Sequence, residues 1–139
     1  MTLEQKKNDL IERLSFLENG QERLAYIVDS AKKFPLLPKE LKMPQYRVEG
    51  CLSNLWFLAE MREGKCFFRV DADSQIVRAI AVLFADFYSD EKPEEILKID
   101  PSFLGQVGIT QHLSPNRRNG LSRLWDQIRG FARSNLPKE

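Results

Sequence analysis

The chain has 139 residues, of which 42% are apolar and 29% charged, a composition typical of one globular domain. Its 21 basic and 20 acidic residues leave a net charge of +1, which argues against a protein that binds nucleic acid through a concentrated basic patch. No apolar run approaches the roughly 18 residues of a membrane span, and the N-terminus lacks the apolar core of a secretory signal. Since two cysteines form no disulfide framework, we expect a cytoplasmic protein with reduced thiols.

Two helices are predicted in the first quarter of the chain. Apolar residues at helical spacing predict an amphipathic helix over residues 3–17 and a second over residues 21–34, separated by Asn19 and Gly20. Several prolines follow between residues 35 and 44. They predict an irregular connector, because proline lacks a backbone donor and restricts the residue before it.

The period of the hydrophobic pattern changes after this connector. Residues 54–62 and 65–71 are rich in aromatic and aliphatic side chains, which predicts two strands. The intervening Glu63 and Gly64 predict a tight hairpin turn that places Cys66 opposite Met61.

Helical patterns return after the strands. Asp73 is the expected N-cap for a helix whose apolar positions end at Phe87, Pro93 opens a short helix through Ile99, and Ser114-Pro115 begins the last helix. Strands that are grouped together predict an α+β fold, because alternating strands and helices would instead favour a parallel sheet. We therefore expect one domain over residues 1–139, with helices packed on one face of a small antiparallel sheet.

Cys51 is the residue whose context best indicates covalent chemistry. It follows Gly50, which permits a sharp turn, and precedes an apolar run, so its thiol is predicted to lie on a turn at the edge of a strand. A thiol attacks only as a thiolate, and no strong local activation is visible because Glu49 opposes Arg47. Cys51 is therefore expected to meet a partner that is already reactive. The alternative is that it is a small buried core residue.

Other reactive sites are disfavoured by residue counts. His112 is the only histidine, whereas a cysteine hydrolase needs a histidine base and an orienting group. Cys66 lies on the order of 33 Å from Cys51 if the chain stays extended, so no internal disulfide is expected and Cys66 is predicted to be a core residue. Two cysteines and one histidine without a CxxC pair give no closed zinc or iron–sulfur site, so no metal is expected.

Three segments, in order, resemble the SufE-type family of sulfur acceptors. Residues 48–56 (VEGCLSNLW) resemble the family's cysteine motif V-x-G-C-x-S-x-V/L-W. Residues 71–79 (DADSQIVRA) resemble its Asp-rich entry into a helix, and residues 113–121 (LSPNRRNGL) resemble its L-[ST]-P-[ST]-R-x-x-G-[LM] segment.

The likeness covers roughly residues 21–132 and leaves the helix within residues 1–19 outside it. Ala72 stands where the family often has serine, and Ala79 where it often has glycine. Both are small residues away from the thiol in sequence, so these departures leave the resemblance intact.

The resemblance implies that Cys51 accepts sulfane sulfur from the persulfide of a cysteine desulfurase of the SufS or CsdA type. The chain would stimulate that enzyme and pass the sulfur to an iron–sulfur scaffold or another acceptor. Pyridoxal phosphate belongs to the partner, so we expect an accessory protein without a cofactor of its own rather than an enzyme. The implied fold is the α+β fold that the family shares with IscU-type scaffolds. Supporting or partner-contact roles are expected at Gly50, Ser53, Trp56, Asp73 and Arg117.

Three alternatives stay open. An iron–sulfur scaffold on the same fold is disfavoured because cluster assembly takes three or more thiolate-type ligands. A redox enzyme that forms a sulfenic acid at Cys51 is disfavoured because no resolving cysteine is present. An adaptor would use Cys51 only structurally. Leu52, Leu55 and Trp56 are expected to shelter a persulfide, whereas Arg117 has an alternative role as a solvated residue of the first helical turn.

Overall fold

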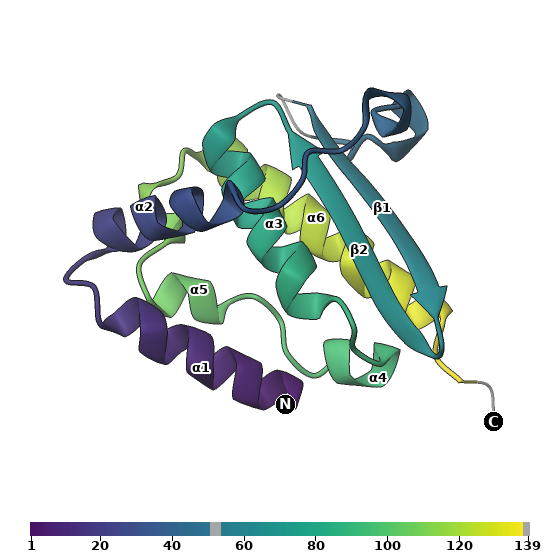
Figure 1. The fold of residues 1–139 in the computed structure, drawn as a ribbon, viewed down its shortest axis with the longest axis horizontal. Coiled ribbons are helices and arrows are strands. Elements are labelled where there is room, and N and C mark those ends of the chain that lie inside the picture. The colour runs from purple at the N-terminus through teal and green to yellow at the C-terminus, as the bar shows by residue number, and fades with distance from the viewer. Residues whose placement is uncertain (51–53, 138–139) are drawn as a thin grey trace.

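The computed structural model describes residues 1–50 and 54–137, except for the side chain of His112. The elements along the chain are α1 (Leu3–Ser15), α2 (Gly20–Ala31), η1 (Lys39–Leu41), η2 (Pro44–Tyr46), β1 (Leu55–Arg62), β2 (Lys65–Ala72), α3 (Gln75–Tyr88), α4 (Pro93–Ile96), α5 (Phe103–Gln106), η3 (Thr110–His112) and α6 (Pro115–Ser134). Figure 1 shows α3 and α6 against one face of the hairpin, with α1 and α2 on the far side of α3. The fold is α+β with a small antiparallel sheet, as predicted.

The two strands form a hairpin with the predicted register. They pair from Leu55 opposite Ala72 to Arg62 opposite Lys65, and Cys66 lies opposite Met61. The turn residues Glu63 and Gly64 have φ values of 50° and 80°. Positive φ at both central positions is the geometry of a tight hairpin turn whose twist matches that of the strands.

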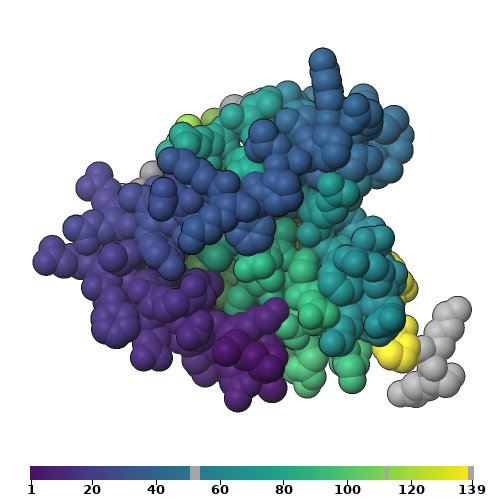
Figure 2. Space-filling view, in the orientation of Figure 1, coloured from purple at the N-terminus to yellow at the C-terminus, as the bar shows by residue number. Residues whose placement is uncertain are grey.

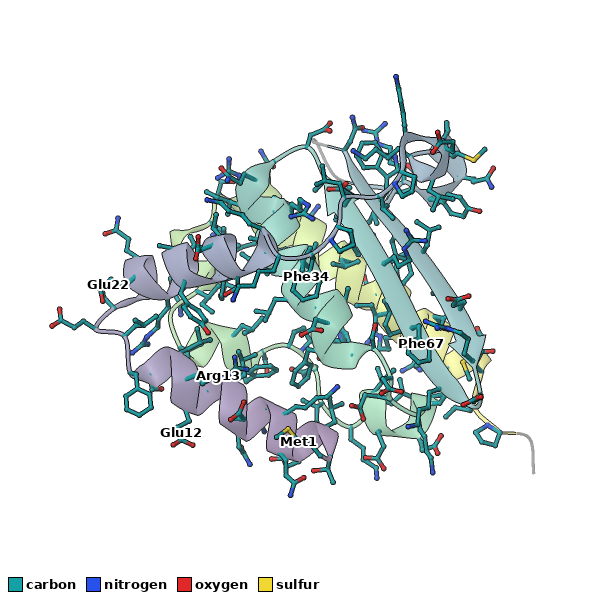
Figure 3. The ribbon with its side chains drawn as sticks, viewed as in Figure 1. Met1, Glu12, Arg13, Glu22, Phe34 and Phe67 are labelled. Carbon is teal, nitrogen blue, oxygen red and sulfur yellow. The ribbon has the colours of Figure 1, made fainter. Side chains whose placement is uncertain are left out.

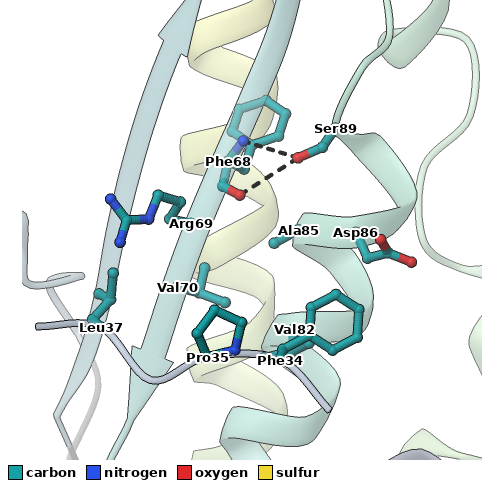
Figure 4. Close-up of a pocket in the computed structure, with 10 residues that line it drawn as sticks. All are labelled: Phe34, Pro35, Leu37, Phe68, Arg69, Val70, Val82, Ala85, Asp86 and Ser89. Carbon is teal, nitrogen blue, oxygen red and sulfur yellow. Dashed lines mark hydrogen bonds between the residues drawn. The ribbon is translucent and has the colours of Figure 1, made fainter. Parts of the chain in front are cut away.

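The free edge of β2 is closed by the segment that follows α3. The backbone N–H of Cys66 donates to the carbonyl of Glu91 at 2.9 Å. The hydroxyl of Ser89 accepts from the N–H of Phe68 at 2.9 Å, and so takes the place of a neighbouring strand. Figure 4 shows this contact at one end of a groove of about 170 Å³ between β2 and α3. These contacts reduce the number of unpaired backbone groups at the edge of β2, where a strand of another chain could otherwise pair.

One face of the hairpin packs against the core, and near the turn the other face is turned towards solvent. Its inner face joins the core through Phe57 and Phe68, whose rings stack with centroids 5.6 Å apart. On the outer face, Phe67 lies towards the turn (Figure 3), and the guanidinium carbon of Arg62 is 3.8 Å from its ring centre. An arginine over an aromatic ring shields apolar surface at a position that faces solvent.

The N-terminal helix shares the core of the rest of the chain. Leu3, Leu10 and Leu14 of α1 are buried in the same cluster as residues of both strands, α3 and α6. The amine of Lys6 lies 2.6 Å from the carboxylate of Glu91 and also donates to carbonyl groups at the end of α3. Figure 2 shows α1 in purple lying directly against the later elements in green and teal. The burial of its apolar stripe therefore fixes α1 to the domain.

Several element boundaries differ from the sequence prediction. The prediction of Asp73 as an N-cap was wrong, because the hydroxyl of Ser74 accepts from the N–H of Val77 and caps α3. The first two helices end at Ser15 and Ala31, two and three residues early, and α4 ends at Ile96 rather than residue 99. The chain after α1 and α2 tightens into three-residue hydrogen-bonded turns, which end the regular helix.

Asp71, at the end of β2, is a buried carboxylate with four partners. It is 1% exposed. One oxygen accepts from Arg78 Nε at 3.0 Å and from the N–H of Ala72 at 2.8 Å. The other accepts from the N–H of Leu37 at 3.0 Å and lies 3.4 Å from Lys42 Nζ. These contacts satisfy a charge that would be costly to bury alone.

Arg78 extends this cluster to the end of α2. Its two terminal nitrogens donate to the carbonyls of Ala31 and Phe34 at 3.1 and 3.2 Å. The Asp71–Arg78 pair therefore joins β2, α3, the end of α2 and the connector that crosses the outer face of the hairpin (Figure 1).

Among the described residues, no helix is both long and apolar enough to cross a membrane.

Replacing Arg78 by alanine is expected to destabilise the fold by about 3–5 kcal/mol, because the Asp71 charge then stays buried without its main partner. The control is Arg129→Ala, which breaks the exposed Arg129–Asp126 pair at 3.0 Å and should cost less than about 1 kcal/mol. Urea unfolding measures both changes. Equal losses in the two variants would contradict the structural role assigned to the buried pair.

Candidate functional site

The predicted site residues fall on both sides of a short gap. Cys51 and Ser53 lie outside the described residues, as does Leu52. Gly50 lies on one side of the gap and Trp56 on the other. Hydrogen bonds to other segments of the chain hold the residues on both sides of the gap, and these residues form the described part of the site.

A pair of backbone contacts closes a loop around the predicted thiol. The N–H of Val48 donates to the carbonyl of Leu55 at 2.7 Å, and Arg47 forms an antiparallel bridge with Trp56. Six residues separate Val48 from Leu55 in the sequence, and the predicted nucleophile Cys51 is the third of them.

Asp73 fixes the residue that follows the gap. Its carboxylate accepts from the side-chain amide of Asn54 at 2.7 Å, and its backbone N–H donates to the Asn54 carbonyl at 3.1 Å. A hydrogen bond to a charged acceptor is stronger than one between neutral groups. Asp73 thus anchors the start of β1 to the turn between β2 and α3.

Gly50 is held against α6 at the other end of the loop. Its φ of +85° lies in the left-handed region, which favours glycine. Its carbonyl accepts from the side-chain amide of Asn119 at 3.1 Å. A Cβ at this position would lie 3.0 Å from Arg123 Nε, so α6 also leaves little room for a side chain.

Leu55 and Trp56 begin β1 and face opposite sides of the hairpin, with Leu55 opposite Ala72 and Trp56 opposite Asp71. Leu55 is fully buried, and Trp56 is 9% exposed. The amine of Lys42 lies 5.3 Å from the centre of the Trp56 ring, a cation–π distance. Lys42 also contacts Asp71, so the tryptophan is tied to the buried ion pair. The role of these residues as a persulfide shelter stays a prediction.

Arg117 lies exposed in the first turn of α6. Its backbone N–H donates to the hydroxyl of Ser114, the predicted cap of that helix, at 3.3 Å. No carboxylate among the described residues lies within ion-pair distance of Arg117, Arg118 or Arg123. The first half of α6 therefore carries positive charge that no described carboxylate offsets at ion-pair distance.

Cys66 is a core residue, as predicted. It is fully buried opposite Met61, six residues along the hairpin from Leu55, or about 20 Å. Burial, with a smaller contribution from the charge of Glu94, raises the pKa of the Cys66 thiol to about 11. The Cys66 thiol is therefore protonated and a poor nucleophile near neutral pH.

Asn119 and Arg123 were missed by sequence reasoning. Asn119 lies within the third motif, and Arg123 is one helical turn further on, which puts both on one face of α6. The helical spacing was visible in the sequence, but the crossing of α6 against Gly50 was not.

No cluster of three or more His, Cys, Asp or Glu side chains that could hold a metal occurs within the described part of the chain.

Replacing Gly50 by alanine is expected to cost about 1–2 kcal/mol from the left-handed backbone alone, with an added cost from displacing Arg123. Gly64→Ala is the matched control, because Gly64 has a φ of +80° and nothing within 4 Å of an added Cβ. Urea unfolding should show the larger loss for Gly50→Ala. The two losses should become equal when Arg123 is alanine, and an unchanged stability of Gly50→Ala would contradict this geometry.

Comparisons with known proteins agree with the fold and the motifs. The family model for the SufE domain, described as an Fe-S metabolism associated domain, matches residues 8–132 and so begins within α1. An uncharacterized SufE-like protein of Rhizobium meliloti is 27% identical, with 94% of this chain and 96% of the relative covered. A second uncharacterized SufE-like protein, from Rhizobium etli, is 28% identical, with 91% of this chain and 88% of the relative covered.

A further relative and a solved structure are similar over most of their length. An uncharacterized SufE-like protein of Synechocystis is 25% identical, with 86% of this chain and 75% of the relative covered. The solution structure of a hypothetical protein from Thermus thermophilus matches with a TM-score of 0.76 and 23% identity, covering 94% of this chain and 95% of that one. This structural likeness shows a shared fold.

Proposed function

The chain belongs to the SufE family of Fe–S metabolism associated domains, and from that premise we propose that it is a sulfur acceptor. Cys51 takes sulfane sulfur from the persulfide of a cysteine desulfurase and passes it to iron–sulfur cluster assembly. By clearing the persulfide, the chain stimulates the desulfurase. The observation that supports this most is the closed loop from Val48 to Leu55, which has Cys51 within it and is anchored at both ends.

The chemistry of this step is a thiol–persulfide exchange. The thiolate of Cys51 attacks the outer sulfur of the partner's persulfide, forming a new S–S bond while the partner's S–S bond breaks. The partner's cysteine leaves as a thiolate, and the transferred sulfur keeps its proton. The exchange has no net oxidation, so it needs neither an oxidant nor a hydrolytic triad. The persulfide itself would be formed on a cysteine of the desulfurase, whose pyridoxal phosphate would enable the removal of sulfur from the substrate cysteine.

The frame of the loop supports this chemistry in two ways. The Asn54–Asp73 contact and the Gly50 contact with α6 set both ends of the loop, which restricts where the reacting sulfur can lie. We propose that the apolar side chains of Leu55 and Trp56, buried on opposite faces of β1, keep water away from the base of the loop and so help to shield a persulfide. We include Leu52 and Ser53 in this loop on the sequence motif alone.

The partner is proposed to dock where α6 begins. Arg117 is exposed there and lies two residues before Asn119, which contacts the loop. A guanidinium group is suited to a carboxylate on the facing surface of a desulfurase, because it can form two parallel hydrogen bonds. Cys66 is no substitute carrier, since its thiol is buried at the other end of the hairpin.

Addition of the chain to a desulfurase with cysteine and reductant is expected to increase alanine release severalfold. Cys51→Ser should abolish the increase, because a hydroxyl cannot take the sulfur. The matched control, Cys66→Ala, should retain it at temperatures where that variant stays folded. Alanine release measured over time tests this prediction directly.

Two other outcomes would redirect the proposal. Full stimulation by Cys51→Ser would favour a binding adaptor in which the thiol has no chemical role. A visible-absorbance cluster that forms on the chain with iron and sulfide, and depends on Cys51, would favour the scaffold alternative.

A further inference from the structure

We propose that Asn119 and Arg123 are positioning residues for sulfur transfer. They hold the Gly50 end of the cysteine loop against α6 and keep a permanent positive charge near the reacting thiol. This inference rests on the proposed function, because it assigns roles in the same exchange. It adds two residues that neither the sequence motifs nor the comparisons single out.

The contacts come from one face of one helix. Asn119 Nδ2 lies 3.1 Å from the Gly50 carbonyl oxygen. The guanidinium of Arg123 covers the same glycine, with Cζ 3.5 Å and Nε 3.0 Å from the place of an added Cβ. The opposite face of α6 is fixed in the core by Leu124 and Ile128, which are fully buried. The platform that carries both contacts is therefore rigid.

Covalent geometry limits how far Arg123 can be from the thiol. Adjacent Cα atoms are about 3.8 Å apart, so the Cα of Cys51 lies within about 9 Å of the Arg123 guanidinium carbon in any conformation of the loop. The sulfur then lies within about 12 Å.

Other charges flank the loop and partly offset one another. Arg47 and Glu49 precede Gly50 and have opposite signs. Asp73 lies on the far side, where it accepts from Asn54, and Arg117 lies at the start of α6. Within the described residues, Arg123 is the cation whose guanidinium lies beside Gly50.

The consequence is a larger thiolate population at neutral pH. At a separation of about 10 Å, attraction between two unit charges raises the ratio of thiolate to thiol roughly twofold in bulk water. The same attraction raises that ratio roughly fifteenfold at the lower effective dielectric constant near a protein surface. Loss of Arg123 should therefore slow the exchange without changing how much sulfur is finally taken up.

The first test measures alkylation of Cys51 by iodoacetamide, followed by mass spectrometry of the peptide that contains it. Arg123→Gln should alkylate roughly two- to fifteenfold more slowly at pH 7 and at the wild-type rate above about pH 10, where the thiol is ionised in both proteins. Arg123→Lys keeps the charge and should restore most of the rate. The control Arg133→Gln removes the same charge from the same helix, about 15 Å further along, and should behave like wild type.

The second test measures single-turnover sulfur uptake from a persulfide-loaded desulfurase. Arg123→Gln and Asn119→Ala should reach the wild-type plateau at a severalfold lower rate, while their melting temperatures stay near that of wild type. Equal alkylation and equal uptake rates in Arg123→Gln and wild type would overturn this inference and leave the proposed function standing. A wild-type chain that takes up no sulfur would overturn both.

Discussion

The buried pair between Asp71 and Arg78 is the interaction on which the arrangement of the domain depends. Arg78 connects α3 with the carbonyls at the end of α2, and Asp71 connects the end of β2 with the connector through Leu37 and Lys42. Because Lys42 also lies over Trp56, the start of β1 is tied to the same cluster. A charged cluster of this kind fixes relative orientation, which apolar packing alone does less specifically.

The candidate site depends on this frame for its two anchors. Asn54 is held by Asp73, which directly follows the strand end that the cluster fixes, whereas Gly50 is held by Asn119 of α6. A carrier that must meet one partner and then another needs a reactive segment that protrudes from a stable base. Here the base includes both strands, α3 and α6, and Cys51 lies between the two anchors in the sequence. Positive charge on α6 lies at the same end of the molecule as the loop.

The sequence predicted features that depend on neighbouring residues. The turn at Glu63 and Gly64 and the start of α6 follow from local backbone preferences, and the structure confirms both. The cap of α3 was wrong by one residue because Asp73 and Ser74 are both good caps, and the contact between Asp73 and Asn54 decided between them. The roles of Asp71 and Arg123 could not be predicted, because each depends on contacts between segments far apart in sequence.

The proposal that Cys51 accepts sulfur is tested most directly by finding which residue carries the transferred sulfur atom. The chain would be incubated with a desulfurase and cysteine labelled with heavy sulfur, blocked with an alkylating reagent, digested and analysed by mass spectrometry. The account predicts one labelled sulfur, removable by reductant, on the peptide that contains Cys51 and none on the peptide that contains Cys66. Label on Cys66, or no label on either peptide while the desulfurase turns over, would contradict it.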